Sequence, residues 1–191
     1  MAINLQKGQN VSLSQESPGI NKIQAGLGWD TQSFSGAAFD LDVMLFLTDG
    51  GGKVISDSHF VFYNNLKSPD GAVEHTGDNL TGDGDGDDEV ILVNLGQIEQ
   101  SVEKVIFTAS IHEAESRRQN FGQVQNAYIR LVDLSSNAEI IRYDLSEDFS
   151  VETSLVVGEL YRRNGEWKFK AIGQGYKDGL VALLRAHGIN A

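Results

Sequence analysis

The sequence predicts a mainly β protein, a two-sheet β-sandwich with a few short peripheral helices and a C-terminal helix. Apolar and polar residues alternate with a period of two along several segments, which is typical of half-buried strands. Turns rich in glycine and asparagine separate these segments, and helical periodicity is scarce. Many short strands joined by turns favour two sheets packed face to face, because each sheet must bury its apolar face.

The predicted strands begin with residues 39–48, where one side is wholly apolar and the other starts with Asp40 and Asp42. Residues 105–111 alternate in the same way, and residues 90–95 form a short apolar run of buried-strand length. Asn164-Gly165 predicts a tight hairpin between the last two strands, because both residues accept positive φ. The later predicted strands are 127–132, 139–143, 154–162 and 167–172.

Helix is predicted mainly at residues 176–187, where leucines recur at helical spacing and Gly188 is placed to end the helix. Segments 97–104 and 114–120 are candidates for short helices. The chain has two prolines, no low-complexity linker and no repeat of domain length. These features predict a single domain over residues 1–191.

Composition excludes several classes of function. The net charge of −12 argues against nucleic acid as a partner, since phosphate backbones recruit Lys and Arg surfaces. The absence of cysteine excludes disulfides, thiolate metal sites and cysteine nucleophiles. The first residues lack the apolar core of a signal peptide, and no stretch approaches transmembrane length. We therefore expect a cytoplasmic protein.

Residues 77–89 form an acidic, glycine-rich segment that is the strongest candidate for a functional site. It holds six carboxylates between Asp78 and Glu89 and no basic residue, so the carboxylates repel one another at neutral pH. The interspersed glycines let the backbone turn tightly and bring oxygens together. An all-oxygen ligand set suits a hard cation, and calcium more than magnesium. The alternative is a solvated acidic loop.

The acidic segment does not match an EF-hand. With Asp83 at the first position, Asp88 takes the sixth, where glycine is required, and Asn94 takes the twelfth, where a bidentate glutamate is needed. Asp40 and Asp42 lie on the same side of one predicted strand, about 7 Å apart at the rise of a strand. Their carboxylates could share an ion with the acidic segment.

Several motifs along the chain match a known family: Gly26-Leu27-Gly28-Trp29-Asp30, Phe39-Asp40-Leu41-Asp42, residues 77–89 and Gly158-Glu159-Leu160-Tyr161-Arg162. Through them the chain strongly resembles, over essentially its whole length, the TerD family of tellurium-resistance and stress-response proteins. The resemblance implies a β-sandwich that binds two calcium ions near one end. The implied ligand candidates are Asp30, Asp40, Asp42, Asp78, Asn79, Asp83, Asp85, Asp87, Asp88 and Glu89.

The function expected from these observations is that of a non-catalytic, calcium-binding scaffold or sensor in a bacterial stress or tellurite-resistance system. Its expected partners are calcium and proteins of a stress-response complex, with membrane association as a further option. A strongly acidic chain without cysteine is poorly suited to bind or reduce the tellurite oxyanion itself. The alternatives are a metal-dependent phosphoesterase and a calcium-dependent membrane or protein adaptor.

Two further features have both a functional and a structural interpretation. Arg117 and Arg118 are candidate partner-contact residues, but Glu113 and Arg117 would also pair at i,i+4 on a short, solvated helix. His75 lies next to the acidic segment and is interpreted as a surface histidine.

Overall fold

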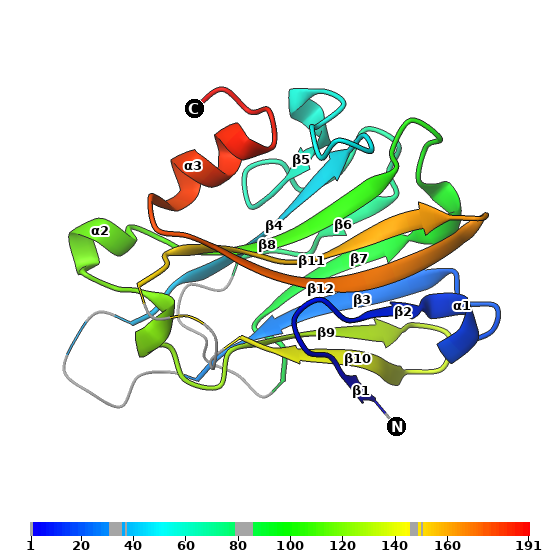
Figure 1. The fold of residues 1–191 in the computed structure, drawn as a ribbon, viewed down its shortest axis with the longest axis horizontal. Coiled ribbons are helices and arrows are strands. Elements are labelled where there is room, and N and C mark those ends of the chain that lie inside the picture. The colour runs from blue at the N-terminus through cyan, green and yellow to red at the C-terminus, as the bar shows by residue number, and fades with distance from the viewer. Residues whose placement is uncertain (1, 31–35, 37, 79–85, 146–148, 150) are drawn as a thin grey trace.

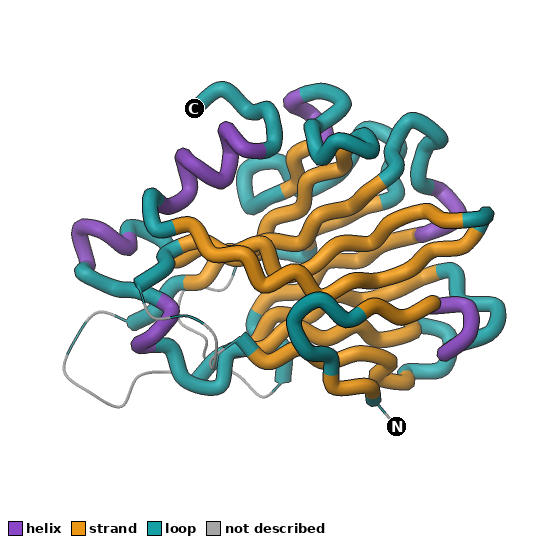
Figure 2. The backbone as a smooth tube through the Cα atoms, viewed as in Figure 1, coloured by secondary structure: helices purple, strands orange, loops and turns teal. Residues whose placement is uncertain are grey.

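The computed structural model describes residues 2–30, 36, 38–78, 86–145, 149 and 151–191. Over these residues the chain folds into two six-stranded β-sheets that pack face to face, with short helices at the periphery (Figure 1). The predicted mainly β sandwich is confirmed. Figure 2 shows how strands dominate the body of the molecule, while the short helices lie around its ends.

Each sheet is largely antiparallel, and β1 with β10 is the only parallel pair among the described strands. The first sheet contains, in spatial order, β1 (Ile3–Asn4), β10 (Ala138–Asp144), β9 (Tyr128–Asp133), β3 (Lys22–Gly28), β7 (Glu89–Asn94) and β6 (Val73–His75). The second contains β2 (Asn10–Ser12), β12 (Glu166–Tyr176), β11 (Ser154–Arg163), β8 (Lys104–Ile111), β4 (Leu41–Thr48) and β5 (Phe60–Val61).

The described α-helices are short: α1 (Leu13–Glu16), α2 (Ala114–Arg117) and α3 (Gly179–Ala186). Single 3₁₀ turns occupy Asp57–His59, Leu95–Gln97 and Phe121–Gln123. The predicted C-terminal helix and the helix after residue 114 are confirmed, although both are shorter than expected.

The helix predicted at residues 97–104 is wrong. The Arg162 guanidinium donates to the backbone carbonyls of Ile98, Glu99 and Val102, at 2.7 to 3.1 Å. Those carbonyls would otherwise bind N–H groups within a helix. Arg162 of β11 therefore holds this segment in a turn, and the next strand, β8, starts at Lys104.

Strand β4 is buried on both faces, and this determines where the candidate site lies. Leu41, Val43, Leu45 and Leu47 point into the core between the sheets. On the opposite face, Met44 and Phe46 belong to a second apolar cluster that includes Leu183 of α3. Side chains alternate along a strand, so Asp40 and Asp42 lie on the same face as Met44. They precede the stretch of β4 that the second apolar cluster covers.

The hairpin predicted at Asn164-Gly165 is confirmed. Both residues have positive φ, at 53° and 76°, and they connect β11 directly to β12. The short edge strands β1, β2, β5 and β6 were not predicted, since two or three residues carry too little periodicity to be recognised. None of the described helices is both long and apolar enough to cross a membrane.

Candidate metal centre

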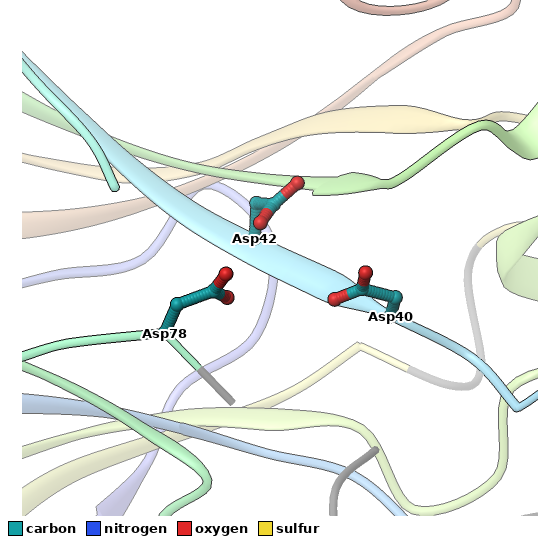
Figure 3. Close-up of side chains that lie close together, drawn as sticks. All are labelled: Asp40, Asp42 and Asp78. Atoms are coloured by element: carbon teal, nitrogen blue, oxygen red, sulfur yellow. The ribbon is translucent and has the colours of Figure 1, made fainter. Parts of the chain in front are cut away.

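Three aspartates from two segments form a carboxylate triad at the start of β4. Asp40 directly precedes β4, Asp42 is its second residue, and Asp78 follows β6 in the chain (Figure 3). One oxygen from each side chain lies within 4.8 Å of the others. Oxygens that bind a single calcium ion at 2.3–2.6 Å lie at most about 5 Å apart, so the spacing suits a shared cation.

The triad is electrostatically unfavourable without a cation. Asp40 and Asp42 are 5% and 6% exposed. Burial raises the pKa of Asp42 to about 8, and the charges of Glu89, Asp40 and Asp78 add to that increase. Burial, followed by the charge of Asp78, also raises the pKa of Asp40. Ionising Asp40 and Asp42 therefore costs free energy, and a bound divalent cation would offset that cost.

One carboxylate oxygen of the triad, Asp40 Oδ1, accepts no hydrogen bond from the described residues. This atom is also buried. A buried carboxylate oxygen normally accepts hydrogen bonds or binds a metal. Together with the all-oxygen donor set and the spacing, this atom shows that the triad fits a hard cation such as calcium.

Glu89 and His75 lie behind the triad. Glu89 Oε2 accepts a hydrogen bond from the backbone N–H of Val43, at 2.6 Å, and lies 3.6 Å from His75 Nε2. The N–H of Gly77 donates to His75 Nδ1, at 3.1 Å, so the ring proton is on Nε2 and faces Glu89. These contacts fix the entry into the acidic segment against β4.

The interpretation of His75 as a surface histidine is wrong, because the residue is 2% exposed. The sequence did contain a signal, since Val73 and His75 are alternate residues next to an apolar strand. Glu89 is 1% exposed, and burial raises its pKa although His75 and the N–H of Val43 act in the opposite direction.

Asp87 and Asp88 fasten the end of the acidic segment to the first sheet. Asp87 Oδ1 accepts from Arg130 Nε at 2.7 Å, and its Oδ2 accepts from Gln24 at 2.9 Å. The Asp87 carboxylate lies directly over Gly26, where a Cβ would be 2.0 Å from Oδ2. Asp88 Oδ2 accepts from the backbone N–H of Trp29, at 2.9 Å. Gly26, the first glycine of the Gly26-Leu27-Gly28 motif, is therefore needed to make room for Asp87.

Among the described residues, the predicted ligands Asp30 and Asp87 are not part of the triad. Asp30 is exposed, and its carboxylate accepts from Asn126 Nδ2. Asn79, Asp83 and Asp85 lie outside the described residues. The structure thus brings Asp40, Asp42 and Asp78 together with Glu89 nearby, and places Asp30 and Asp87 in other interactions.

Arg117 and His112, in the segment after β8, lie near the triad. Arg117 pairs with Glu113 at 3.3 Å, as the i,i+4 spacing predicted, and its charge lowers the pKa of Asp40. Arg118 ends α2 in the left-handed region, at φ 53°, and is exposed. Sequence reasoning missed His112, whose Nδ1 lies 3.7 Å from Asp42 Oδ2. No local motif marks this histidine, because β-sheet pairing alone brings it to β4.

A family model and individual proteins of known sequence both match this chain over nearly its whole length. The TerD domain model matches residues 1–187. The chain is 54% identical over 191 residues to tellurium resistance protein TerD of Serratia marcescens, covering 100% of both chains. It is 52% identical over 190 residues to general stress protein 16U of Bacillus subtilis (strain 168), covering 99% of this chain and 98% of the other.

A solved structure shows the same fold. The crystal structure of a homologue of telluride resistance protein (TerD) from Streptomyces coelicolor A3(2) superposes with a TM-score of 0.72 at 21% identity. The superposition covers 89% of this chain and 97% of the other. With the family model matched over nearly its full length, the chain belongs to the TerD domain family of tellurium-resistance and stress-response proteins.

Proposed function

We propose that this chain is a non-catalytic, calcium-binding scaffold or sensor that binds about two calcium ions and acts through protein partners. The observation that carries the proposal is the carboxylate triad, in which Asp40 and Asp42 are buried and Asp78 is exposed. The spacing of the triad and the raised pKa values of Asp40 and Asp42 favour a bound divalent cation. So does Asp40 Oδ1, which has no hydrogen-bond donor among the described residues. Calcium is favoured over magnesium because it accepts an irregular set of oxygens without strict octahedral geometry.

In this proposal the carboxylates have different roles. Asp40, Asp42 and Asp78 would hold the first ion. Glu89 would position Asp42 through its contact with the β4 backbone. Asp87 would anchor the segment, because Arg130 and Gln24 already use both of its oxygens. Asn79, Asp83, Asp85 and Asp88 are the candidates for a second ion.

The proposed cellular role follows from the relatives. Proteins that are 54% and 52% identical over almost the whole chain are named for tellurium resistance and for general stress. A chain with 27 acidic residues, 15 basic residues and no cysteine offers no obvious group for tellurite chemistry. We therefore propose that it supports resistance through calcium-dependent contacts with other proteins in the cytoplasm, rather than through reaction with tellurite.

Calorimetric titration of metal-free protein with calcium tests the proposal. Wild type should bind about two ions and bind magnesium more weakly. Asp40→Asn should lose at least one binding event, whereas Asp57→Asn should bind like wild type, because Asp57 is an exposed residue of a 3₁₀ turn. Both variants remove one negative charge, so general electrostatics are matched. Equal calcium binding by wild type and Asp40→Asn would refute the proposed site.

A metal-dependent phosphoesterase is a second candidate, favoured by His112. Its Nδ1 lies 3.7 Å from Asp42, so the imidazole could hold or move a proton beside a metal-bound substrate. Purified protein would be assayed with p-nitrophenyl phosphate and calcium, magnesium or manganese. Turnover that disappears in both Asp42→Asn and His112→Gln, while both variants stay folded, would support the enzyme. Absence of turnover with all three metals would exclude it for this substrate.

A further inference from the structure

A large cleft lies beside the carboxylate triad, and Asp42 is the one proposed calcium ligand among its described lining residues. It has a volume of about 1000 Å³ and is bordered by the residues around α2 and the start of α3. Asp42 and Tyr63 also line the cleft. Asp42 therefore belongs both to the triad and to the lining of the cleft. Figure 1 shows α2 and α3 at the same end of the molecule, away from α1.

The rim of the cleft is mainly acidic. Glu113, Glu115 and Asp178 are exposed lining residues, and Lys177 is the only lysine or arginine among the described residues that line it. Arg117 partly neutralises Glu113 through their 3.3 Å ion pair. Glu115 and Asp178 have no ion pair with any described residue and remain available to a cation from outside.

The wall of the cleft also presents apolar side chains to solvent. Leu180 and Val181, at the start of α3, are 37% and 45% exposed. Leu183 of the same helix is fully buried in the second apolar cluster, so the helix is held in place by other residues. Adjacent exposed apolar residues inside an acidic cleft are typical of a surface that another molecule covers.

We propose that this cleft binds a basic, amphipathic segment of a partner protein. Apolar side chains of that segment would cover Leu180 and Val181, and its Lys or Arg residues would pair with Glu115 and Asp178. Charge complementarity favours a basic partner, since the chain as a whole carries a net charge of −12. The inference rests on the proposed function in one respect, namely that the chain acts through partners.

Calcium and the basic segment should oppose each other. A calcium ion at the triad places positive charge beside Asp42, which also lines the cleft. That charge repels a basic segment, so calcium should weaken binding of the segment, and by linkage the segment should weaken calcium binding by the same factor. Calcium would then release the partner rather than recruit it.

Fluorescence anisotropy with a short labelled peptide of alternating lysine and leucine tests the cleft. Glu115→Lys should weaken binding by at least about fivefold. Glu16→Lys, on the exposed surface of α1 at the other end of the molecule, should change it less than about twofold, because charges beyond about 8 Å are largely screened at physiological salt. Both variants make the same change in net charge. Peptides with glutamate in place of lysine, or serine in place of leucine, should bind poorly.

The outcomes separate the cleft from the calcium site. Equal weakening by Glu115→Lys and Glu16→Lys would overturn the cleft, because only net charge would then matter. Asp178→Lys serves as a second cleft variant if Glu115→Lys does not fold. Loss of peptide specificity with an intact calcium-induced melting shift would reject this inference alone. Peptide binding without any calcium shift would reject the calcium proposal and retain the cleft.

Equal peptide affinity with calcium and with chelator, in protein that binds calcium, would overturn the antagonism. Asp42→Asn should show that same insensitivity to calcium, because it lacks the residue shared by the triad and the cleft.

Discussion

Replacing Asp42 with asparagine should have opposite effects on stability with and without calcium. In metal-free protein, folding holds the Asp42 carboxyl in a buried site beside three other acids, where its pKa is raised to about 8. An ordinary aspartate has a pKa of 3.8. Keeping this group protonated at pH 7 therefore costs at most about 4 kcal/mol of folding free energy. Asparagine has a similar shape and carries no such cost.

The destabilisation caused by Asp42 in metal-free protein increases with pH. Below the unfolded pKa, Asp42 is protonated in both states and contributes no penalty. As pH rises above that value, the unfolded chain releases its proton while the folded protein retains it, so stability falls until the pH reaches about 8. We expect metal-free Asp42→Asn to be about 1–4 kcal/mol more stable than wild type at pH 7.5 and close to wild type near pH 4.

Calcium should reverse that order. Wild type should gain about 2.7 kcal/mol at a calcium concentration 100-fold above its dissociation constant, whereas Asp42→Asn should gain much less. Urea denaturation in chelator and in calcium, at both pH values, measures all of these quantities. Asp57→Asn is the matched control and should follow wild type throughout, because Asp57 is exposed.

Two results would refute the reasoning. Metal-free Asp42→Asn that is less stable than wild type at both pH values would mean that Asp42 makes a net favourable contact in the folded state. An equal calcium gain in wild type and Asp42→Asn would mean that calcium binds elsewhere.

Three further predictions concern other parts of the structure. Gly26→Ala should cost about 1–3 kcal/mol and break the Asp87–Arg130 ion pair, but should cost much less in an Asp87→Ala background, as a double-mutant cycle by urea denaturation would show. Additive costs would contradict this packing. Hydrogen bonds to the Asp133 carboxylate, of which the one from Ser17 has the largest effect, lower its pKa to about 2. Asp133→Asn should therefore remove about 1–2 kcal/mol of stability that wild type has above pH 4 and loses as pH falls through about 2, and equal acid unfolding curves would contradict this role. Calcium should raise the melting temperature more than magnesium at equal concentration, and equal shifts would contradict the irregular oxygen site.

Local patterns predicted much of the fold. The period-two alternation at residues 39–48 corresponds to β4, and the Asn164-Gly165 hairpin joins β11 to β12 as expected. These predictions succeed because side-chain alternation and positive φ are properties of a few neighbouring residues. The helix at residues 97–104 fails because Arg162, from β11, binds its carbonyls, and no property of that segment reveals a distant guanidinium.

The candidate site was predicted in part for the same reason. Asp40 and Asp42 were expected to share an ion because alternate residues lie on one face of a strand, and the structure places both in one triad. The contribution of Asp78 depends on the acidic segment returning to β4, which the sequence offered as an option but no local pattern could establish. His112 reaches Asp42 through the pairing of β8 with β4, which is set by long-range register.

The sequence by itself excluded thiolate ligands and cysteine nucleophiles, because the chain has no cysteine. It also determined that most of the chain forms strands. Only the tertiary structure decided which carboxylates meet. Asp87 belongs to the same acidic segment as Asp78, yet Arg130 and the space above Gly26 hold it against the first sheet. The sequence shows which residues can supply oxygen ligands. Packing and ion pairs between distant strands determine where those side chains point.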